Sequence, residues 1–598
     1  MRKYSPYLIL LLPFLLLVVF EQDYLYRAAE QNLFLHTPMF FLQCMLTSGG
    51  LLSWCGAYLT QYFHYPALGA GLLCLLWALL VRLLHAAFRL PRTWLLLALV
   101  PVVCLLISIT DLGYWLFYLK LRGHLFVATL GCLVVVSLSW AYLHLPRRRG
   151  LRTLLIVLTV SLGYPLFGFY ALFAALLMAV LSWRSGGWRW ADTLSALLLV
   201  VAVPLVCYHT VYHQTNIVNI YWTGLPVFCR VGQRYFAYNL PYIFLFASLL
   251  LMALCYRQER PLQTLSKPWQ WARRALLGAM ALCVALFWYK DDNFHRELSM
   301  MRSLEEQNWE QAVQTSANVS GEPTRAICLM RNLALARLGQ LGDEMFLHPI
   351  GARRPNAPFT VRMVDTIGRL VYLQYGVVNY CYRWCMEQGV EYGWSVEKLK
   401  LMVKCSLLNG EFQAAQKYLS LLKKSDFQGS WVRKYTELAH HPQLMAQDAE
   451  LQTIHHLQRP DNFLTADMSL LEKFLIEHFA TAQSTDPLFQ EQVLVATMMA
   501  KNSSMFWRQF YVYTSLHGQQ RVPRHYQEAA CLMGPLQGAD ISRMPFDAEV
   551  VSSYQAFGQA LAQCQQRNLS EEQTRAALYE RFHQTYYYDY YFRVRSYE

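Results

Sequence analysis

Residues 65–84 read YPALGAGLLCLLWALLVRLL, an apolar run whose one charged side chain is Arg82. A helix of about 20 apolar residues is long enough to cross the hydrocarbon core of a bilayer. Within lipid, a single segment satisfies all of its backbone hydrogen bonds only as a helix. This stretch therefore predicts a transmembrane α-helix.

Similar runs recur throughout the first half of the chain and predict about nine spans. Several of the runs are short. The two on either side of Gly163, Tyr164 and Pro165 are either two spans or one broken or re-entrant unit. The predicted segments are 5–21, 65–84, 93–110, 124–143, 151–164, 166–183, 190–208, 240–256 and 272–288.

The charge distribution supports a membrane location for the same half. The chain is 55% hydrophobic and 15% charged, whereas soluble proteins carry about 25% charged residues. Its net charge of +13 comes from residues 1–288, which hold 21 Lys and Arg against 6 Asp and Glu, while residues 289–598 hold 31 against 33. Because the excess positive charge is confined to the apolar half, it indicates membrane orientation and removes the main support for nucleic-acid binding.

The positions of the basic residues predict which loops are cytoplasmic. If Arg2 and Lys3 are inside, the inside loops hold 16 basic residues and the outside loops 5. Insertion resists carrying Lys and Arg across the bilayer, so the N-terminus is expected in the cytoplasm. An odd number of spans then places everything after about residue 289 outside the cell membrane. If one span is miscounted, that part of the chain lies in the cytoplasm instead.

The second half predicts a helical repeat. Four turn-forming residues recur at a constant interval along the chain: Asn308, Gly342, Gly376 and Gly410. Glycine and asparagine tolerate the positive φ that a turn between helices requires. The interval equals the tetratricopeptide period, a helix–turn–helix unit of about 34 residues. Phe412 and Ala415 match the aromatic and small positions of that motif.

The expected fold is therefore all-α, with a polytopic transmembrane helical domain followed by a soluble α-solenoid of tetratricopeptide-like helical hairpins. Residues 1–288 form the first domain, with an external loop at 24–63. Residues 289–425 hold the repeats and 426–598 hold divergent helical repeats, because terminal repeats commonly diverge. The chain ends in an aromatic segment, 585–593, that is either a stacking platform for a sugar or peptide or a tail docked on the last helices.

Several stretches resemble a known family. Residues 30–35 (EQNLFL), 58–70 (YLTQYFHYPALGA) and 522–529 (VPRHYQEA), together with the Tyr-rich end, are similar to a multi-pass inner-membrane family of Bacteroidota whose function is unknown. The resemblance implies a bacterial inner-membrane protein, in which the external side predicted above for the C-terminal domain is the periplasm. It implies no activity and no catalytic residue.

The few acidic residues of the apolar half suggest candidate catalytic groups. Glu21 and Asp23 follow the first predicted span and Asp111 follows the third. That layout is similar to the GT-C membrane glycosyltransferases, which place an acidic residue in the first external loop and use lipid-linked sugar donors. A carboxylate there could accept the acceptor's proton or bind a divalent cation.

Four external basic residues are the candidate diphosphate ligands: Lys120, Arg122, Arg230 and Arg234. The structural alternative is that the carboxylates are ordinary interface residues, with Asp23 paired to Arg27 one helical turn later at an exposed surface. No DxD motif is present, which weakens the metal-dependent version.

Other chemistry has little support in the sequence. His209 and His213 have a spacing that two metal ligands can share, but no third ligand accompanies them, so no metal site is expected and an interfacial aromatic loop is the better interpretation. No nucleotide-binding, hydrolase or zinc-protease motif occurs, and no cofactor follows from the sequence. Cys381 and Cys385, one turn apart, are expected to be packing residues.

Two functions remain open. One is a membrane-anchored protein that binds or assembles a periplasmic partner in the repeat groove, since solenoids present concave binding surfaces. The other is a GT-C-like transferase acting on a lipid-linked substrate, with the repeat domain presenting the acceptor. Nine spans exceed what anchoring alone needs, which is the argument for the second.

Overall fold

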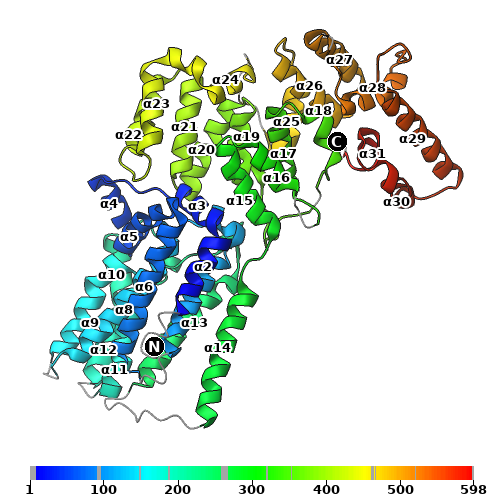
Figure 1. The fold of residues 1–598 in the computed structure, drawn as a ribbon. Helices are drawn as coiled ribbons and strands as arrows, with labels where there is room; N and C mark the ends of the chain where they lie inside the picture. Colours follow the sequence, from blue (N-terminus) through cyan, green and yellow to red (C-terminus); the bar gives the residue numbers. More distant parts are fainter. Residues whose placement is uncertain are drawn as a thin grey trace. The chain divides into compact units, whose positions relative to one another are not determined.

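A computed structural model describes residues 9–90, 96–146, 150–185, 189–256, 267–317, 321–351, 353–459, 464, 467–518 and 520–594. It divides into two compact units (Figure 1). Unit 1 comprises residues 1–290, 388–400 and 417–436, and unit 2 comprises 291–387, 401–416 and 437–598. Among the described residues the regular secondary structure is helical, apart from one isolated bridge and a hairpin of two short strands, β1 (Cys229–Arg230) and β2 (Gln233–Arg234).

Unit 1 contains five helices that are long and apolar enough to cross a membrane. They are α6 (Pro66–Ala87), α8 (His124–His144), α12 (Arg189–Thr210), the stretch Phe236–Leu254 that contains η5 (Phe236–Asn239) and α13 (Leu240–Leu254), and Gln270–Phe287 within α14 (Lys267–Phe287). Five such helices indicate a membrane protein. Each of them coincides with a span predicted from the sequence.

The other four predicted spans correspond to shorter apolar helices, so nine full crossings are not shown. At 1.5 Å per residue, a helix of 10–17 residues is about 15–25 Å long and falls short of the ~30 Å hydrocarbon core. These helices are α2 (Leu11–Phe20), Leu96–Thr110 containing α7 (Leu99–Thr110), α9 (Leu151–Ser161) and α11 (Phe169–Ser185). Predicted residues 5–8 and 93–95 lie outside the described residues.

Between α9 and α11 the helical run is interrupted around Gly163 and again at Gly168. α9 is followed by the short α10 (Gly163–Phe167), and α11 starts directly after Gly168. Gly168 has φ +57°, and a Cβ there would lie 2.5 Å from the carbonyl oxygen of Thr223. Only glycine fits that position, because both the backbone conformation and the close approach exclude a side chain.

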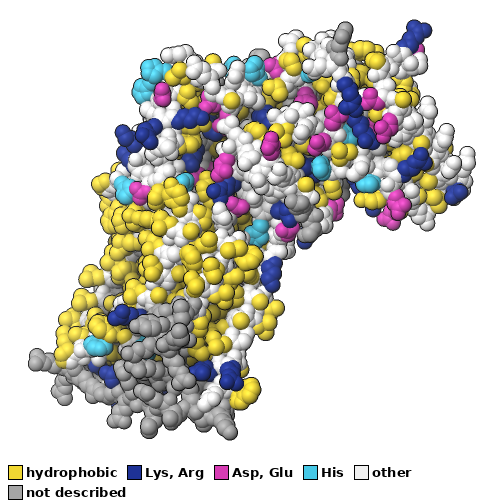
Figure 2. Space-filling model, in the orientation of Figure 1, with side chains coloured by type: hydrophobic (Ala, Val, Ile, Leu, Met, Phe, Trp, Pro, Cys, Tyr) yellow, Lys and Arg dark blue, Asp and Glu magenta, His cyan; other side chains and the backbone are white. Residues whose placement is uncertain are grey.

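The apolar helices of unit 1 turn much of their hydrophobic surface outward. Only 6% of the apolar window of α14 and 17% of that of α12 are buried within the protein, against 61% for α8. Figure 2 shows hydrophobic side chains with few charges over this group of helices, whereas positive and negative side chains intermingle over unit 2. Exposed apolar surface on this scale requires lipid around it.

The predicted loop 24–63 is itself helical. α3 (Gln22–Glu30) continues almost directly from α2 and is followed by α4 (Pro38–Met45), α5 (Gly50–Thr60) and η1 (Gln61–His64). The hydroxyl of Thr37 caps α4 by accepting a hydrogen bond from the Phe40 N–H at 3.2 Å. A small aromatic core centred on Phe34, Phe40 and Trp54 holds the segment together.

Unit 2 is built mainly from helices. They are α15 (Asp292–Glu305), α16 (Trp309–Ala317), α17 (Arg325–Arg337), α18 (Leu341–Glu344), η7 (Val364–Gly368), α19 (Arg369–Gln374), α24 (Ala449–His456), α25 (Leu471–Ala480), α26 (Pro487–Met499), α27 (Ser503–His517), α28 (Arg524–Leu536), α29 (Ala548–Gln566), α30 (Glu571–Phe582) and α31 (Tyr586–Phe592). Residues of α20 (Val378–Tyr392), α21 (Val396–Leu408), α22 (Phe412–Leu422) and α23 (Gly429–His440) are shared between the two units.

One turn geometry recurs between successive helices of unit 2. In each case a residue with positive φ follows the helix by two positions, its N–H bonds to the carbonyl three residues back, and the next N–H bonds to the carbonyl five residues before it. This is the Schellman motif, which satisfies the last carbonyls of a helix. The left-handed residues are Gln307, Gly339, Gly376, Gly410, Lys501, Gly538 and Asn568.

Of the four predicted turn residues, two have the predicted positive φ and two do not. Gly376 and Gly410 both have φ +74°, as expected. Asn308 instead caps α16, because its side-chain oxygen accepts a hydrogen bond from the Gln311 N–H at 3.2 Å. Gly342 lies within α18, where a Cβ would be 2.6 Å from the Cβ of Pro523. That glycine is required by close packing and not by φ.

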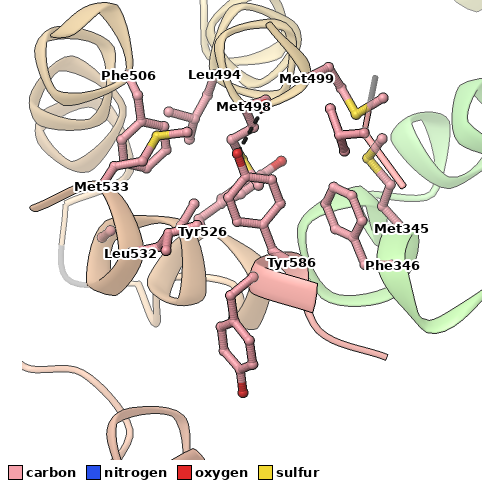
Figure 3. Packing of buried hydrophobic residues seen from close by; sticks show 14 of the residues in the cluster. Met345, Phe346, Leu494, Met498, Met499, Phe506, Tyr526, Leu532, Met533 and Tyr586 are labelled. Carbon is pink, nitrogen blue, oxygen red and sulfur yellow. Dashed lines mark hydrogen bonds between the residues drawn. The ribbon is translucent and has the colours of Figure 1, made fainter. Parts of the chain in front are cut away.

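Most of the aromatic end of the chain is docked, although Tyr591 stays 46% exposed. Tyr586, Tyr587 and Tyr588 are completely buried in the main core cluster of unit 2. Figure 3 shows Tyr586 among methionine, leucine and phenylalanine side chains, with its hydroxyl donating to the Met498 carbonyl at 2.8 Å. The final helix α31 is thus part of the core of unit 2.

Candidate functional site

The first predicted catalytic residue, Glu21, is a buried hydrogen-bond acceptor. It stands between α2 and α3, and its carboxylate accepts a hydrogen bond from the indole Nε1 of Trp288 at 2.6 Å. Asp23 lies in the first turn of α3 and is half-exposed. An acidic residue in a first helical turn is favourable for the helix dipole, so Asp23 has a structural role available whatever its chemistry.

Asp111 directly follows the apolar helix α7, and burial raises the pKa of its carboxyl to about 7. The Tyr24 hydroxyl donates to the Ile109 carbonyl at 3.1 Å, and the Tyr289 N–H donates to the Thr110 carbonyl at 3.1 Å. Together with the Trp288–Glu21 bond, these contacts gather the ends of α2, α7 and α14 at one end of unit 1. Glu21 and Asp111 therefore belong to the same region.

Two of the four predicted phosphate ligands share an aromatic neighbour. The guanidinium carbon of Arg230 lies 3.8 Å from the centre of the Tyr118 ring, and Arg230 donates to the Tyr392 hydroxyl. The Lys120 ammonium lies 5.6 Å from the centre of the same Tyr392 ring. Such cation–π contacts orient the two cations.

The other two predicted phosphate ligands, Arg122 and Arg234, have different neighbours. Arg122 is 5.4 Å from the Phe40 ring centre and 3.9 Å from the Cys44 sulfur, beside the aromatic core of the 24–63 segment. Arg234 is exposed on β2, in the hairpin whose tip is Val231. Lys120 and Arg230 thus share the Tyr392 ring, whereas Arg122 contacts Phe40 and Cys44.

A buried charged cluster in unit 1 was not predicted from the sequence. The Lys400 ammonium donates to both carboxylate oxygens of Glu30 at 3.0 Å, and His64 lies 3.8 Å from the same carboxylate. Burial alone would raise the pKa of Glu30, but Lys400, His64 and Arg27 outweigh it and lower that pKa to about 2. Glu30 was visible as one of six acidic residues, but no local pattern identifies a partner 370 positions away.

Arg27 belongs to this cluster and corrects one expectation. Its side chain is 1% exposed and pairs with Glu397 at 3.7 Å. The sequence predicts that Arg27 lies at an exposed interface and pairs there with Asp23. The predicted exposure is wrong, because the Arg27 side chain is buried. Because its carboxylate partner is distant in the sequence, Arg27 connects the α3 segment to residues 396–400.

Unit 2 contains a cavity of about 1550 Å³ that opens to solvent. Its walls come from α15, α17, α25, the turn after α26, the described residues 349–351 and 353–363, Thr366 of η7, and the C-terminal helices α30 and α31. None of the seven predicted site residues lines it. The helices that form the cavity could be predicted from sequence but the cavity could not, because its walls are far apart along the chain.

The cavity lining is charged with both signs. Some of these charges have partners. Arg325 binds Glu472 within the lining, with one contact at 3.1 Å; Arg593 binds Asp589, behind the lining, at 3.2 Å; and Glu297 accepts a hydrogen bond from the Thr324 hydroxyl. No ion pair within the described residues engages the remaining lining charges. These are the cations Arg353, Arg354, Lys501 and Arg575 and the carboxylates Glu322, Glu571, Glu572 and Glu580.

Aromatic and apolar side chains complete the lining. Tyr579 and Tyr591 are each 46% exposed and contribute one ring apiece. Ile350, Val361 and Met499 add aliphatic surface. A large concave site with apolar contacts and convergent polar groups is a typical ligand-binding surface.

No group of three His, Cys, Asp or Glu side chains suited to a metal ion occurs among the described residues. His209 and His213 are both exposed at the end of α12 and in the following turn. The cysteines of the described residues are free thiols, and Cys381 and Cys385 are completely buried, as packing residues are.

Comparison with known proteins places the chain in a family. The model of a family of unknown function, DUF6057, matches residues 2–593. The chain belongs to the DUF6057 family. No curated protein and no solved structure matches it. This membership agrees in part with the resemblance found in the sequence: DUF6057 is a family of unknown function, and its model covers nearly the whole chain. It assigns no reaction, so the function of this DUF6057 protein has to be argued from its sites.

Proposed function

We propose that the protein binds a partner in the cavity of unit 2 and is held at the membrane by the apolar helices of unit 1. The observation that carries this proposal is the cavity volume, about 1550 Å³. Pockets for small molecules have volumes of about 300–1,000 Å³. A larger, open and charged cavity is suited to a segment of another macromolecule.

The helical hairpins of unit 2 are proposed to be tetratricopeptide-like repeats. Three features support this. α16 packs against both α15 and α17, α15 also contacts α17, and the same Schellman turn recurs from Gln307 to Asn568. Ala415, in the small position of the motif, is completely buried, and Phe412 is half-buried. Stacked hairpins of this kind form concave surfaces for partners.

The proposed location is the bacterial inner membrane, with a cytoplasmic N-terminus and unit 2 in the periplasm. The support is the distribution of basic residues, 16 against 5 between the two sets of loops. A reporter fused at residue 450 should therefore be active only outside the cytoplasm. Activity of that fusion inside the cytoplasm would contradict the proposed orientation.

The binding role is tested by site-specific photo-crosslinking in living cells. Tyr579 and Tyr591, both half-exposed in the cavity, are replaced one at a time by benzoylphenylalanine. Tyr511, 57% exposed on α27 and outside the cavity lining, is the matched control. We expect a discrete adduct at 579 or 591 and none at 511. Absence of an adduct at both cavity positions in correctly inserted protein would contradict a binding role for this cavity.

A transferase that uses a lipid-linked donor is the second candidate. It is favoured by Asp111, whose pKa of about 7 suits a general base, and by the contacts that gather Glu21 and Asp111 at one end of unit 1. Lys120 and Arg230 would hold the diphosphate. Because a general base contributes roughly 100- to 10,000-fold, Asp111→Asn should abolish complementation of a deletion strain without lowering protein abundance. Full complementation by both Asp111→Asn and Asp23→Asn would eliminate this candidate.

A further inference from the structure

The cavity of unit 2 has four cations and four carboxylates without an ionic partner among the described residues. The cations are Arg353 and Arg354 in a loop, Lys501 in the turn after α26, and Arg575 on α30. Three of the four carboxylates are also on α30: Glu571, Glu572 and Glu580. Burial lowers the pKa of Lys501 from its usual value. A ligand that covers these groups removes water from charges of both signs, which is unfavourable unless the ligand supplies opposite charges.

That requirement separates the classes of ligand. A nucleic acid or another polyanion would match Arg353 and Arg354 but bring negative charge against the carboxylates of α30. A neutral glycan would leave charges of both signs desolvated and unpaired. A polypeptide carries acidic and basic side chains a few residues apart, so it alone among common biopolymers complements both sets. Tyr579 and Tyr591 provide the aromatic surface on which an apolar anchor residue packs.

We infer that the ligand of this cavity is a polypeptide segment of another protein, with acidic side chains against Arg353 and Arg354, basic side chains against Glu571 and Glu572, and an apolar residue against Tyr591. This inference rests on the proposed binding role and specifies its ligand. The charges fix the register of the segment, and the aromatic contacts supply the apolar part of the binding energy.

The test reverses each set of charges in the full-length protein that carries benzoylphenylalanine at Tyr591. One variant combines Arg353→Glu with Arg354→Glu, and the other combines Glu571→Arg with Glu572→Arg. Arg543→Glu is the control, because Arg543 is 91% exposed and outside the cavity lining. All five side chains are exposed, so each variant should insert and fold. Because Glu571 and Glu572 lie in the first turn of α30, their reversal should lower the melting temperature slightly, and each melting temperature is measured alongside the adduct.

Either cavity reversal should reduce the adduct at least tenfold, and Arg543→Glu should leave it unchanged. Proteolysis of the adduct should release a crosslinked peptide that holds both acidic and basic residues. Three results would overturn the polypeptide inference while leaving the binding role intact. They are an adduct that survives proteolysis but not glycan or lipid hydrolysis, an adduct that increases when the carboxylates are reversed, and an adduct insensitive to both reversals. No adduct in the parent protein would overturn the binding role itself.

Discussion

The ammonium of Lys400 donates to both carboxylate oxygens of Glu30, each at 3.0 Å, across 370 positions of sequence. Glu30 is 3% exposed and Lys400 is 17% exposed, so the pair is largely withdrawn from water. Through this pair, residues 396–400 belong to the same compact unit as the apolar helices. A segment that the sequence places within the second half of the chain is therefore part of unit 1.

Removing one partner of this pair should be far more damaging than removing both. Lys400→Met leaves the Glu30 carboxylate buried without its main cation, and breaking a buried pair in this way costs about 3–5 kcal/mol. Adding Glu30→Gln should recover most of the loss. Lys423→Met, at an exposed lysine directly after α22, is the control and should be nearly silent. Melting temperatures in detergent check the ordering, and equal effects of Lys400→Met and the double variant would contradict it.

The same pair predicts an acid sensitivity. The pKa of Glu30 is lowered from 4.5 to about 2 in the folded protein. Its contribution to stability is therefore fully present above about pH 4.5 and is lost as the pH falls toward 2. The acid-induced fall in melting temperature of unit 1 should be smaller in Glu30→Gln than in the wild type. Identical pH profiles of the two proteins would show that Glu30 is not ionised in the folded state.

Asp589 should make unit 2 less stable as the pH rises, the opposite of the effect of Glu30 on unit 1. Burial raises the pKa of its carboxyl from 3.8 to about 8, although Arg593 opposes that shift. Its contribution to stability is thus present below about pH 4 and is lost as the pH rises through 8. Asp589→Asn should therefore flatten the stability profile of unit 2 between about pH 4 and pH 8. Loss of stability at every pH in Asp589→Asn would instead indicate that the Arg593 ion pair dominates.

A side chain at Gly410 should be unfavourable for a conformational reason alone. It has φ +74°, and an added Cβ would meet nothing within 4 Å. Gly410→Ala should therefore destabilise unit 2 by about 1–2 kcal/mol, the energy of a left-handed L-residue. Gly558→Ala is the matched control, because Gly558 is helical and equally open, and there alanine should stabilise by up to about 1 kcal/mol. Urea titrations followed by circular dichroism measure both, and a neutral Gly410→Ala would contradict the turn argument.

Two native cysteines test the orientation across one membrane helix. Cys229 in β1 precedes α13 and Cys255 follows it, and both are exposed. In single-cysteine variants, a membrane-impermeant maleimide should label Cys229 in intact cells and Cys255 only after permeabilisation. The reverse pattern would invert the proposed topology. Labelling of both in intact cells would show that α13 does not cross the bilayer.

The apolar helices could be located from sequence because the signal is local. A run such as 65–84 must be helical in lipid, whatever its neighbours are. The lengths of the helices were harder to predict from sequence. Where a helix ends depends on turns such as the one at Gly168, and glycine is needed there because the Thr223 carbonyl packs against it. The same limit explains Gly342, which looked like a turn residue and is a close-packing residue against Pro523.

The candidate sites were less predictable than the helices. The sequence identified which acidic and basic residues follow apolar runs, but not that Arg230 stacks on Tyr118 while Arg122 lies beside Phe40. The cavity of unit 2 was not predicted at all, because its walls come from residues between Glu297 and Val594.

The order of residue types along each segment was enough to establish that the first half is a set of apolar helices and the second a series of helices joined by turns. Both properties are local, and the resemblance to a family of unknown function was also visible at that level. Folding was needed to establish that Lys400 neutralises Glu30, that the Tyr-rich end is buried core, and that charges of both signs line one cavity. Those features depend on side chains far apart in the chain, whose energies are set by burial and by the charges that folding places beside them.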